Sequence, residues 1–322
     1  MFQSRRPTAS AVKAGIEGSL LTTTYNIRSY DEATYMNEVN RIAQRNLDAR
    51  PKTGVATYNY GTESKDISSV SRVKDAPATN YPINGTNAFT KFFAAHLIAG
   101  TEYIDISDYI GTDRNDVPGP YDALEEAITQ NAYALGVEDY TLYVKQGIMQ
   151  VTYNINKDDR AKAQKGISDE VAKLKDTIVK SGMSDKEKAR AINNYLVDNA
   201  TYDDDAFNRR SILFDDKPLA HYASSILVNK TGVCDGYASA FKVLADAVGL
   251  DSVVVTGRIK GSVIGHAWNK VYMDNKWQIV DVTFNDSDTE KNKYFGLTDA
   301  NADRIQYTGF VADPLIRNYA AN

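Results

Sequence analysis

The sequence of 322 residues contains few cysteines and histidines, the side chains that most often bind zinc. It has one cysteine, Cys234, and three histidines, His96, His221 and His266. A single cysteine excludes an internal disulfide and any metal site built from several thiolates. The histidines are too far apart in the sequence to have the short spacing of paired zinc ligands. We therefore expect no metal and no cofactor.

Long apolar runs and basic blocks are also missing. No run of about 18 apolar residues occurs, so no transmembrane helix is expected, and the first residues lack the apolar core of a signal peptide. The 37 basic and 42 acidic side chains are spread along the chain, which argues against nucleic acid as a partner. With 43% apolar residues the chain can bury a substantial core. Nothing in these counts bears on the oligomeric state.

The first half of the chain predicts an arm followed by alternating helices and strands. Residues 1–26 are small, polar and weakly periodic, which is typical of a flexible arm. From 27 to 157, helical stripes alternate with strand patterns, and "TLYVK" and "IMQVTYNI" flank a tight turn at Gln146-Gly147. His96 lies in a phenylalanine-rich stripe, so we interpret it as a core residue. Residues 27–157 therefore predict an N-terminal α+β domain of unknown function.

The second half, residues 158–322, begins with helices and continues with strands. Apolar residues from Ile167 to Ile178 have helical spacing, and "SDKE" from Ser184 has the form of a capping box that begins another helix. Three period-two segments follow, "SVVVTGRI", "HAWNKVYM" and "KWQIVDVTF", which predict antiparallel strands with a two-residue turn at Asp274-Asn275. The fold class predicted for the whole chain is α+β.

Cys234 lies in "KTGVCDGYASAF", at the expected start of a helix. Gly232 interrupts any preceding helix, and apolar helical periodicity begins at Tyr237. A helix start favours a thiolate and lowers the cysteine pKa, and its free N–H groups can bind an oxyanion. Gly236 would leave room for a substrate backbone. The alternative is a buried structural cysteine that packs as a small apolar residue.

A base for this nucleophile is suggested by the predicted hairpin. With a turn at Asp274-Asn275, His266 is opposite Thr283, and Asp281 lies one diagonal step away on the same face. An imidazole and a carboxylate can then pair, as a catalytic base requires. His221, thirteen residues before the cysteine, is a rival base that we interpret as a solvated histidine.

Three aromatic residues are weaker candidates. Tyr202 and Tyr222 precede the cysteine and could supply an oxyanion or substrate contact. Trp268 could line a substrate groove or pack in the core, and the sequence leaves both alternatives open.

Five sequence segments together resemble the transglutaminase-like superfamily, relatives of the papain-type cysteine proteases. The segments, which span residues 183–299, are "MSDKEKARAINNYLVDNATYD", "GVCDGYASAF", "GHAWNKVYMDNKW", "VDVTFND" and "YFGLTD". The resemblance implies a core in which the nucleophile helix packs on an antiparallel sheet. It also implies Cys234 as nucleophile, His266 as general base and then acid, and Asp281 as the residue that orients the imidazole.

The resemblance further implies attack on an amide bond of a protein or peptide, with a thioester acyl-enzyme resolved by an amine or by water. Bacterial members of this shape are often secreted, which predicts a chain at the surface of a Gram-positive bacterium with a substrate associated with the cell wall. The alternative hypothesis is a catalytically idle scaffold that serves as a cell-surface binding module.

Overall fold

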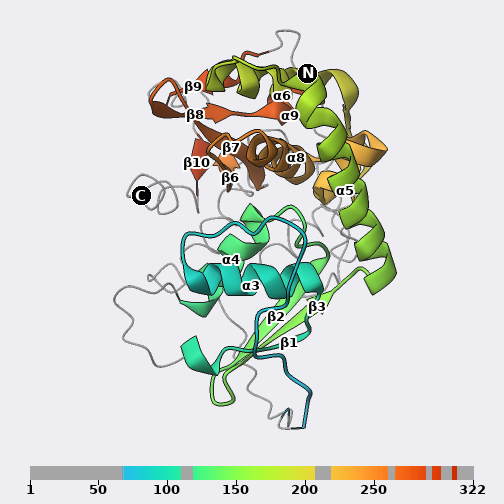
Figure 1. Cartoon of the computed structure of the whole chain (residues 1–322), viewed down its shortest axis with the longest axis vertical. Coiled ribbons are helices and arrows are strands. Elements are labelled where there is room, and N and C mark those ends of the chain that lie inside the picture. Colours follow the sequence, from blue (N-terminus) through green and yellow to red (C-terminus); the bar gives the residue numbers. More distant parts are fainter. Residues whose placement is uncertain are drawn as a thin grey trace, which may run out of the picture.

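The computed structural model describes residues 67, 69–109, 119–206, 219–259, 265–287, 292–298 and 307–309. Figure 1 shows two parts, which we call the N-terminal part (residues 69–156) and the C-terminal part (residues 157–309). The predicted arm and the elements expected before residue 67 lie outside the described residues. No helix among the described residues is long and apolar enough to cross a membrane.

The N-terminal part packs two helices on a three-stranded antiparallel sheet with the order β1-β3-β2. Its elements are α3 (Ala88–Ala99), β1 (Tyr103–Asp105), the 3-10 turn η2 (Ser107–Tyr109), α4 (Pro120–Gln130), β2 (Val137–Tyr143) and β3 (Ile148–Tyr153). Tyr143 pairs with Ile148, so the hairpin loop has four residues. The prediction of a tight turn at Gln146-Gly147 was therefore too short.

The C-terminal part places helix α8 against a five-stranded sheet with the order β10-β6-β7-β8-β9, in which all neighbours are antiparallel. Its helices are α5 (Lys157–Ile178), α6 (Asp185–Asn199), η3 (Leu219–His221), η4 (Ser225–Asn229), α8 (Cys234–Ala247) and α9 (Val282–Ser287). Its strands are β4 (Thr201–Tyr202), β5 (Thr231–Gly232), β6 (Ser252–Ile259), β7 (His266–Met273), β8 (Lys276–Val280), β9 (Phe295–Leu297) and β10 (Tyr307–Gly309). The predicted α+β class, with a helix on an antiparallel sheet, is confirmed.

Local sequence signals account for several of these boundaries. The Ser184 side chain and Glu187 form both hydrogen bonds of a capping box, which confirms the predicted start of α6. Asp274 and Asn275 have φ values of 53° and 59°, as a two-residue turn with both residues left-handed requires. Met273 therefore pairs with Lys276, which is the register that the sequence predicted.

The third predicted strand is shorter than expected. β8 ends at Val280, and α9 begins at Val282 instead of a strand that continues to Phe284. Asp281 initiates this helix, because its Oδ1 accepts the Phe284 N–H at 3.1 Å and its carbonyl accepts the Asn285 N–H at 3.1 Å. The side-chain cap converts a period-two sequence into a helical turn.

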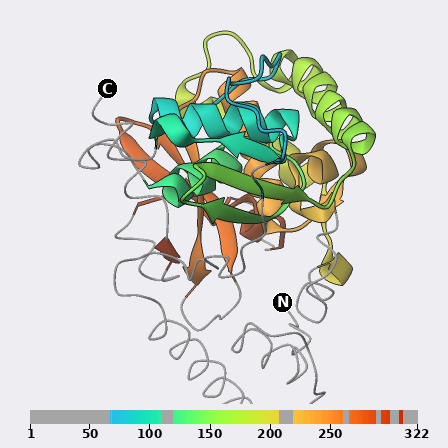
Figure 2. The same cartoon turned by 90° about the horizontal axis from the view of Figure 1, so that it is seen from below.

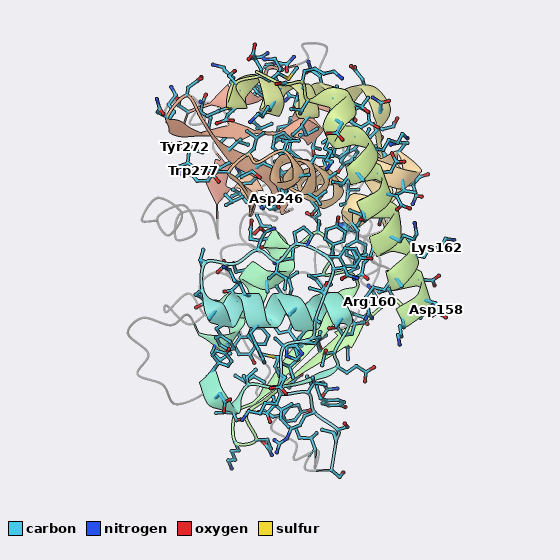
Figure 3. The ribbon with its side chains drawn as sticks, viewed as in Figure 1. Asp158, Arg160, Lys162, Asp246, Tyr272 and Trp277 are labelled. Carbon is cyan, nitrogen blue, oxygen red and sulfur yellow. The ribbon has the colours of Figure 1, made fainter. Side chains whose placement is uncertain are left out.

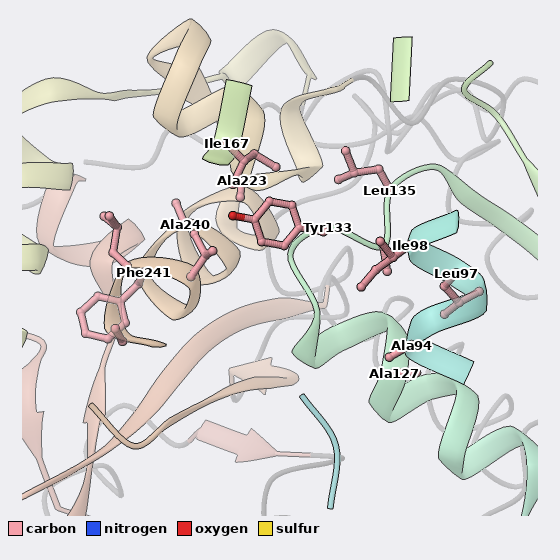
Figure 4. Packing of buried hydrophobic residues seen from close by; sticks show 14 of the residues in the cluster. Ala94, Leu97, Ile98, Ala127, Tyr133, Leu135, Ile167, Ala223, Ala240 and Phe241 are labelled. Atoms are coloured by element: carbon pink, nitrogen blue, oxygen red, sulfur yellow. The ribbon is translucent and has the colours of Figure 1, made fainter. Parts of the chain in front are cut away.

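The two parts share one hydrophobic cluster. Figure 4 shows Ile98 of α3, Tyr133 of the loop after α4 and Ala240 of α8 within it. Helix α5 runs along one side of both parts in Figures 1 and 2. At the end of α8, Asp246 accepts a hydrogen bond from Asn84 Nδ2 at 2.9 Å, and Figure 3 places Asp246 between the parts. The division into domains 27–157 and 158–322 stays a prediction.

His96 lies in the core of the N-terminal part, as the sequence predicted. Its side chain is fully buried, its ring contacts Phe92 edge-on at a centroid distance of 4.4 Å, and Nδ1 lies 3.2 Å from Thr101 Oγ1. Burial lowers the pKa of His96 to about 4. The folded protein therefore holds this imidazole neutral at pH values where an unfolded chain protonates it.

This burial predicts acid lability. The folded pKa is below the unfolded value of 6.5, so the stabilisation is complete above pH 6.5 and is lost as the pH falls towards 4. The free energy of unfolding should fall by about 3 kcal/mol over this range through His96. We expect His96→Leu to flatten the dependence, measured by urea unfolding at pH 4 to 7. Equal pH slopes for the two proteins would contradict the assignment.

Candidate active site

Cys234 is the first residue of α8, with Val233 as the N-cap. The chain is fixed at this point by a contact with η3, because the Val233 N–H donates to the Ala220 carbonyl at 3.0 Å. A Cβ added at Gly236 would lie only 2.7 Å from the same oxygen, so glycine is required for this close approach. The predicted position of Cys234 at a helix start is confirmed.

His266 and Asp281 form a close, buried pair. The imidazole Nε2 lies 2.6 Å from Asp281 Oδ2, and the Asp281 side chain is fully buried. The expected pairing is present although Asp281 lies just beyond β8. One carboxylate therefore both begins α9 through Oδ1 and orients the imidazole through Oδ2.

The thiol of Cys234 is hydrogen-bonded to the His266 imidazole. Because Nε2 is bonded to Asp281, Nδ1 is the ring nitrogen left to face the sulfur. The structure thus places a thiol, an imidazole and a carboxylate in one hydrogen-bonded series. These groups come from the start of α8, the start of β7 and the residue that follows β8.

Opposing effects set the charge of the imidazole. Burial disfavours the charged form of His266 and lowers its pKa. The charge and the hydrogen bond of Asp281 outweigh burial, and Cys234 makes a smaller contribution in the same direction. Together they raise the pKa of His266 to about 10. An imidazolium is therefore the form of His266 at neutral pH. This cation is a proton donor positioned beside the sulfur.

The Cys234 thiol differs from the sequence expectation. Its pKa is raised, first by burial and then by the neighbouring Asp235 carboxylate, while His266 lowers it. The expectation that the helix start would lower the cysteine pKa was therefore wrong. The helix start is present, but the Cys234 side chain is only 5% exposed and lies beside the negative charge of Asp235. Both conditions disfavour a thiolate and favour the neutral thiol.

Two aromatic rings hold the His266 ring in place. Phe284 stacks on it at a centroid distance of 4.7 Å, and Trp268 lies at 5.8 Å. Trp268 is buried in a cluster with Val253 and Ile279, so its core alternative is the one that the structure supports. Sequence reasoning missed Phe284, because a continuous strand would have put it on the opposite face.

Gly236, Tyr222 and Tyr202 were also candidates for contacts with the substrate. Gly236 is buried and its open side is occupied by Ala220, so the expected room for a substrate backbone is absent there. The Tyr222 hydroxyl lies near Gly136 and Asn154 of the N-terminal part, and burial raises its pKa to about 12. Tyr202 is half-buried in β4, beside the strand that leads into Cys234. The substrate roles of Tyr202 and Tyr222 stay predictions.

Helix α9 is anchored by polar contacts that the sequence did not reveal. The Tyr237 hydroxyl donates to Asp286 Oδ2 at 2.6 Å, which connects α8 to α9. Asn285 is fully buried, donates to Asn193 of α6 at 2.8 Å and accepts the Tyr294 N–H at 2.8 Å. These bonds fix α9, and therefore Asp281, against the nucleophile helix. Their partners are distant in sequence, so no local pattern indicates them.

His221 is not the solvated histidine that the sequence predicted. Its side chain is 5% exposed, and Nδ1 lies 2.7 Å from Asp235 Oδ2. The error arose because residues 219–229 form a 3-10 turn and a π-helical turn, where α-helical periodicity assigns faces wrongly. Among the described residues, no group of three or more histidine, cysteine or acidic side chains could hold a metal ion.

Comparison with known proteins shows what the segment that contains this site is similar to. Residues 172–282 match the model of the transglutaminase-like superfamily. This segment contains Cys234, His266 and Asp281, and the resemblance predicted from the sequence motifs is confirmed. The C-terminal part is thus similar to the transglutaminase-like superfamily over these residues.

Individual relatives are distant. Kyphoscoliosis peptidase of Mus musculus is 27% identical over 148 residues, which is 42% of this chain and 22% of the relative. The protein of the same name from Homo sapiens is 27% identical over 132 residues, or 38% of this chain and 18% of the relative. The chain thus spans about a fifth of the curated relatives it matches. A solved transglutaminase structure has 22% identity and a TM-score of 0.31, covering 48% of this chain and 38% of its own.

Proposed function

We propose that the chain is a cysteine acyltransferase or cysteine protease that attacks amide bonds of proteins or peptides. The observation that carries this proposal is the hydrogen-bonded series of Cys234, His266 and Asp281, with Asp281 fully buried and 2.6 Å from the imidazole. A thiol and an imidazolium oriented by a carboxylate are the groups that acyl transfer through sulfur requires.

The proposed reaction uses each group in turn. The Cys234 thiol first loses its proton to solvent, and the thiolate attacks the carbonyl carbon of the amide. The His266 imidazolium gives its proton to the departing nitrogen. This leaves a thioester on the sulfur. The neutral imidazole then takes a proton from an incoming amine or water, which attacks the thioester and releases the thiolate. Asp281 keeps its negative charge and holds the ring throughout.

An assay with casein and a fluorescent primary amine tests the reaction and separates its outcomes. Amine incorporation indicates transamidation, release of ammonia without incorporation indicates hydrolysis of side-chain amides, and release of peptides indicates proteolysis. Any of the three supports an amide-directed enzyme. Their joint absence, at pH values on both sides of neutral, would contradict the proposal.

Cys234→Ala is expected to abolish whichever of these activities the wild-type chain shows. The variant removes the only sulfur that can form the thioester. It should remain folded, since truncating this small buried side chain costs about 1 kcal/mol. Activity and thermal unfolding are measured on the same preparation. Residual turnover above background would assign the chemistry to another residue.

A second candidate is an idle scaffold that binds at a cell surface. It is favoured by the 5% exposure of Cys234 and by the burial that raises the pKa of its thiol. The compartment proposed for either function is the surface of a Gram-positive bacterium, with a cell-wall-associated protein or peptide as partner. Co-sedimentation with purified Gram-positive cell walls, together with no turnover of casein, would favour the scaffold.

A further inference from the structure

Asp235, the residue after the proposed nucleophile, contacts two groups at once. Its Oδ1 lies 3.6 Å from Cys234 Sγ, and its Oδ2 lies 2.7 Å from His221 Nδ1. An ionised carboxylate only accepts hydrogen bonds, so the thiol and the His221 Nδ1–H both donate to it. Asp235 therefore connects the sulfur to a second histidine, His221, in addition to His266.

The surrounding chain fixes this second histidine. The carbonyl of Ala220, next to His221, accepts the Val233 N–H and the Ser225 Oγ hydroxyl, each at 3.0 Å. These bonds hold the end of η3 against the residue that precedes Cys234. The His221 side chain is 5% exposed, whereas Asp235 is 33% exposed. A buried donor thus orients a carboxylate that solvent can still reach.

We propose that Asp235, oriented by His221, is a positioning residue that holds the Cys234 thiol in its protonated resting form. The pair thereby sets the pH range in which the sulfur becomes a thiolate. On ionisation the S–H bond breaks and the proton passes to solvent, leaving the thiolate between an anionic Asp235 and a cationic His266. The consequence for turnover rests on the proposed function, but the ionisation itself is measured without any substrate.

Among the described residues, other charged or titratable groups also act near this arrangement. His266 favours the thiolate, and Asp281 keeps His266 charged. Tyr222 and Glu138 interact with each other, and Tyr222 also interacts with Asp235. Asp235 is the acidic side chain that approaches the sulfur directly. Removing its charge is therefore the change that acts on the thiol with least disturbance elsewhere.

The test is the rate of iodoacetamide labelling of Cys234 as a function of pH. Asp235→Asn keeps the shape of the side chain but removes the negative charge beside the sulfur. The midpoint of the labelling profile should fall by about one pH unit, so labelling below both midpoints becomes about tenfold faster. Asp169→Asn, which removes an exposed carboxylate on α5, is the matched control and should leave the midpoint unchanged.

Two variants test the part played by His221. His221→Asn can retain a donor near the Nδ1 position, so its midpoint should match the wild-type value. His221→Phe removes the donor that orients Asp235, so the midpoint should fall, but by less than in Asp235→Asn. A role confined to folding would lower the melting temperature without moving the midpoint.

Two results would overturn the inference. An unchanged or higher midpoint in Asp235→Asn would exclude the charge effect, and a wild-type midpoint in His221→Phe would exclude the orienting role of His221. Failure of the proposed function gives a different result. In that case the midpoint shifts as described, but the wild-type chain turns over no amide substrate.

Discussion

Asp281→Asn is expected to lower turnover by about 10³- to 10⁴-fold while the protein remains folded. The asparagine Oδ1 can still accept the Phe284 N–H that begins α9. Its Nδ2 then faces His266 Nε2 as a donor, which forces the imidazole proton onto Nδ1, towards the sulfur. A neutral ring in that tautomer cannot accept a proton from the incoming water or amine.

Two further variants separate orientation of the imidazole from capping of the helix. Asp281→Ala should lose turnover to the same extent and should also lose about 1 kcal/mol of stability through the missing cap. Asp203→Asn is the matched control, because Asp203 also caps a helical turn, accepting the Ala206 N–H at 2.7 Å. It should keep most of the turnover. Near-normal turnover in Asp281→Asn would contradict the role given to this carboxylate.

Gln130→Ala is expected to lower the free energy of unfolding by about 2–4 kcal/mol. Gln130 is fully buried at the end of α4, and its amide pairs with both backbone groups of Val254 in β6. Nε2 donates to the carbonyl at 2.9 Å, and Oε1 accepts the N–H at 3.0 Å. Alanine would leave both backbone groups without this partner, and the N-terminal part would lose a direct attachment to the sheet beside α8.

Urea unfolding measures this effect, with Gln146→Ala as the control. Gln146 is exposed in the loop between β2 and β3, so truncating its side chain should change stability by less than about 0.5 kcal/mol. A change of that small size in Gln130→Ala would show that the pairing with Val254 adds little to the attachment of the two parts.

Much of the fold could be predicted where local pattern and tertiary structure agree. β6 and β7 have the predicted bounds because their period-two sequences are also buried in a sheet. α6 begins at its capping box, and the Asp274-Asn275 turn fixes the hairpin register. The segment after Val280 could not be predicted in this way. Its alternating pattern favours a strand, but the Asp281 cap and the buried bonds of Asn285 favour a helix.

The candidate site could likewise be predicted only where it depends on local features of the sequence. The helix start at Cys234 and the pairing of His266 with Asp281 could be predicted, because a helix start and a hairpin register are local features, and the resemblance joined the three residues in one site. It did not predict that Asp235 would raise the thiol pKa, since that effect depends on burial and on contact geometry. It also assigned His221 to solvent. The contact between His221 and Asp235, fourteen residues apart, depends on two irregular turns that periodicity does not describe.

The central claim is that Cys234 forms a covalent thioester with the acyl group of its substrate. The most direct measurement is acid quenching of the protein during turnover of casein, followed by mass spectrometry of the peptide that contains Cys234. We predict an acyl adduct on this residue that disappears after hydroxylamine treatment and never forms in Cys234→Ala. Turnover that proceeds with an unmodified Cys234, or that survives in Cys234→Ala, would contradict it.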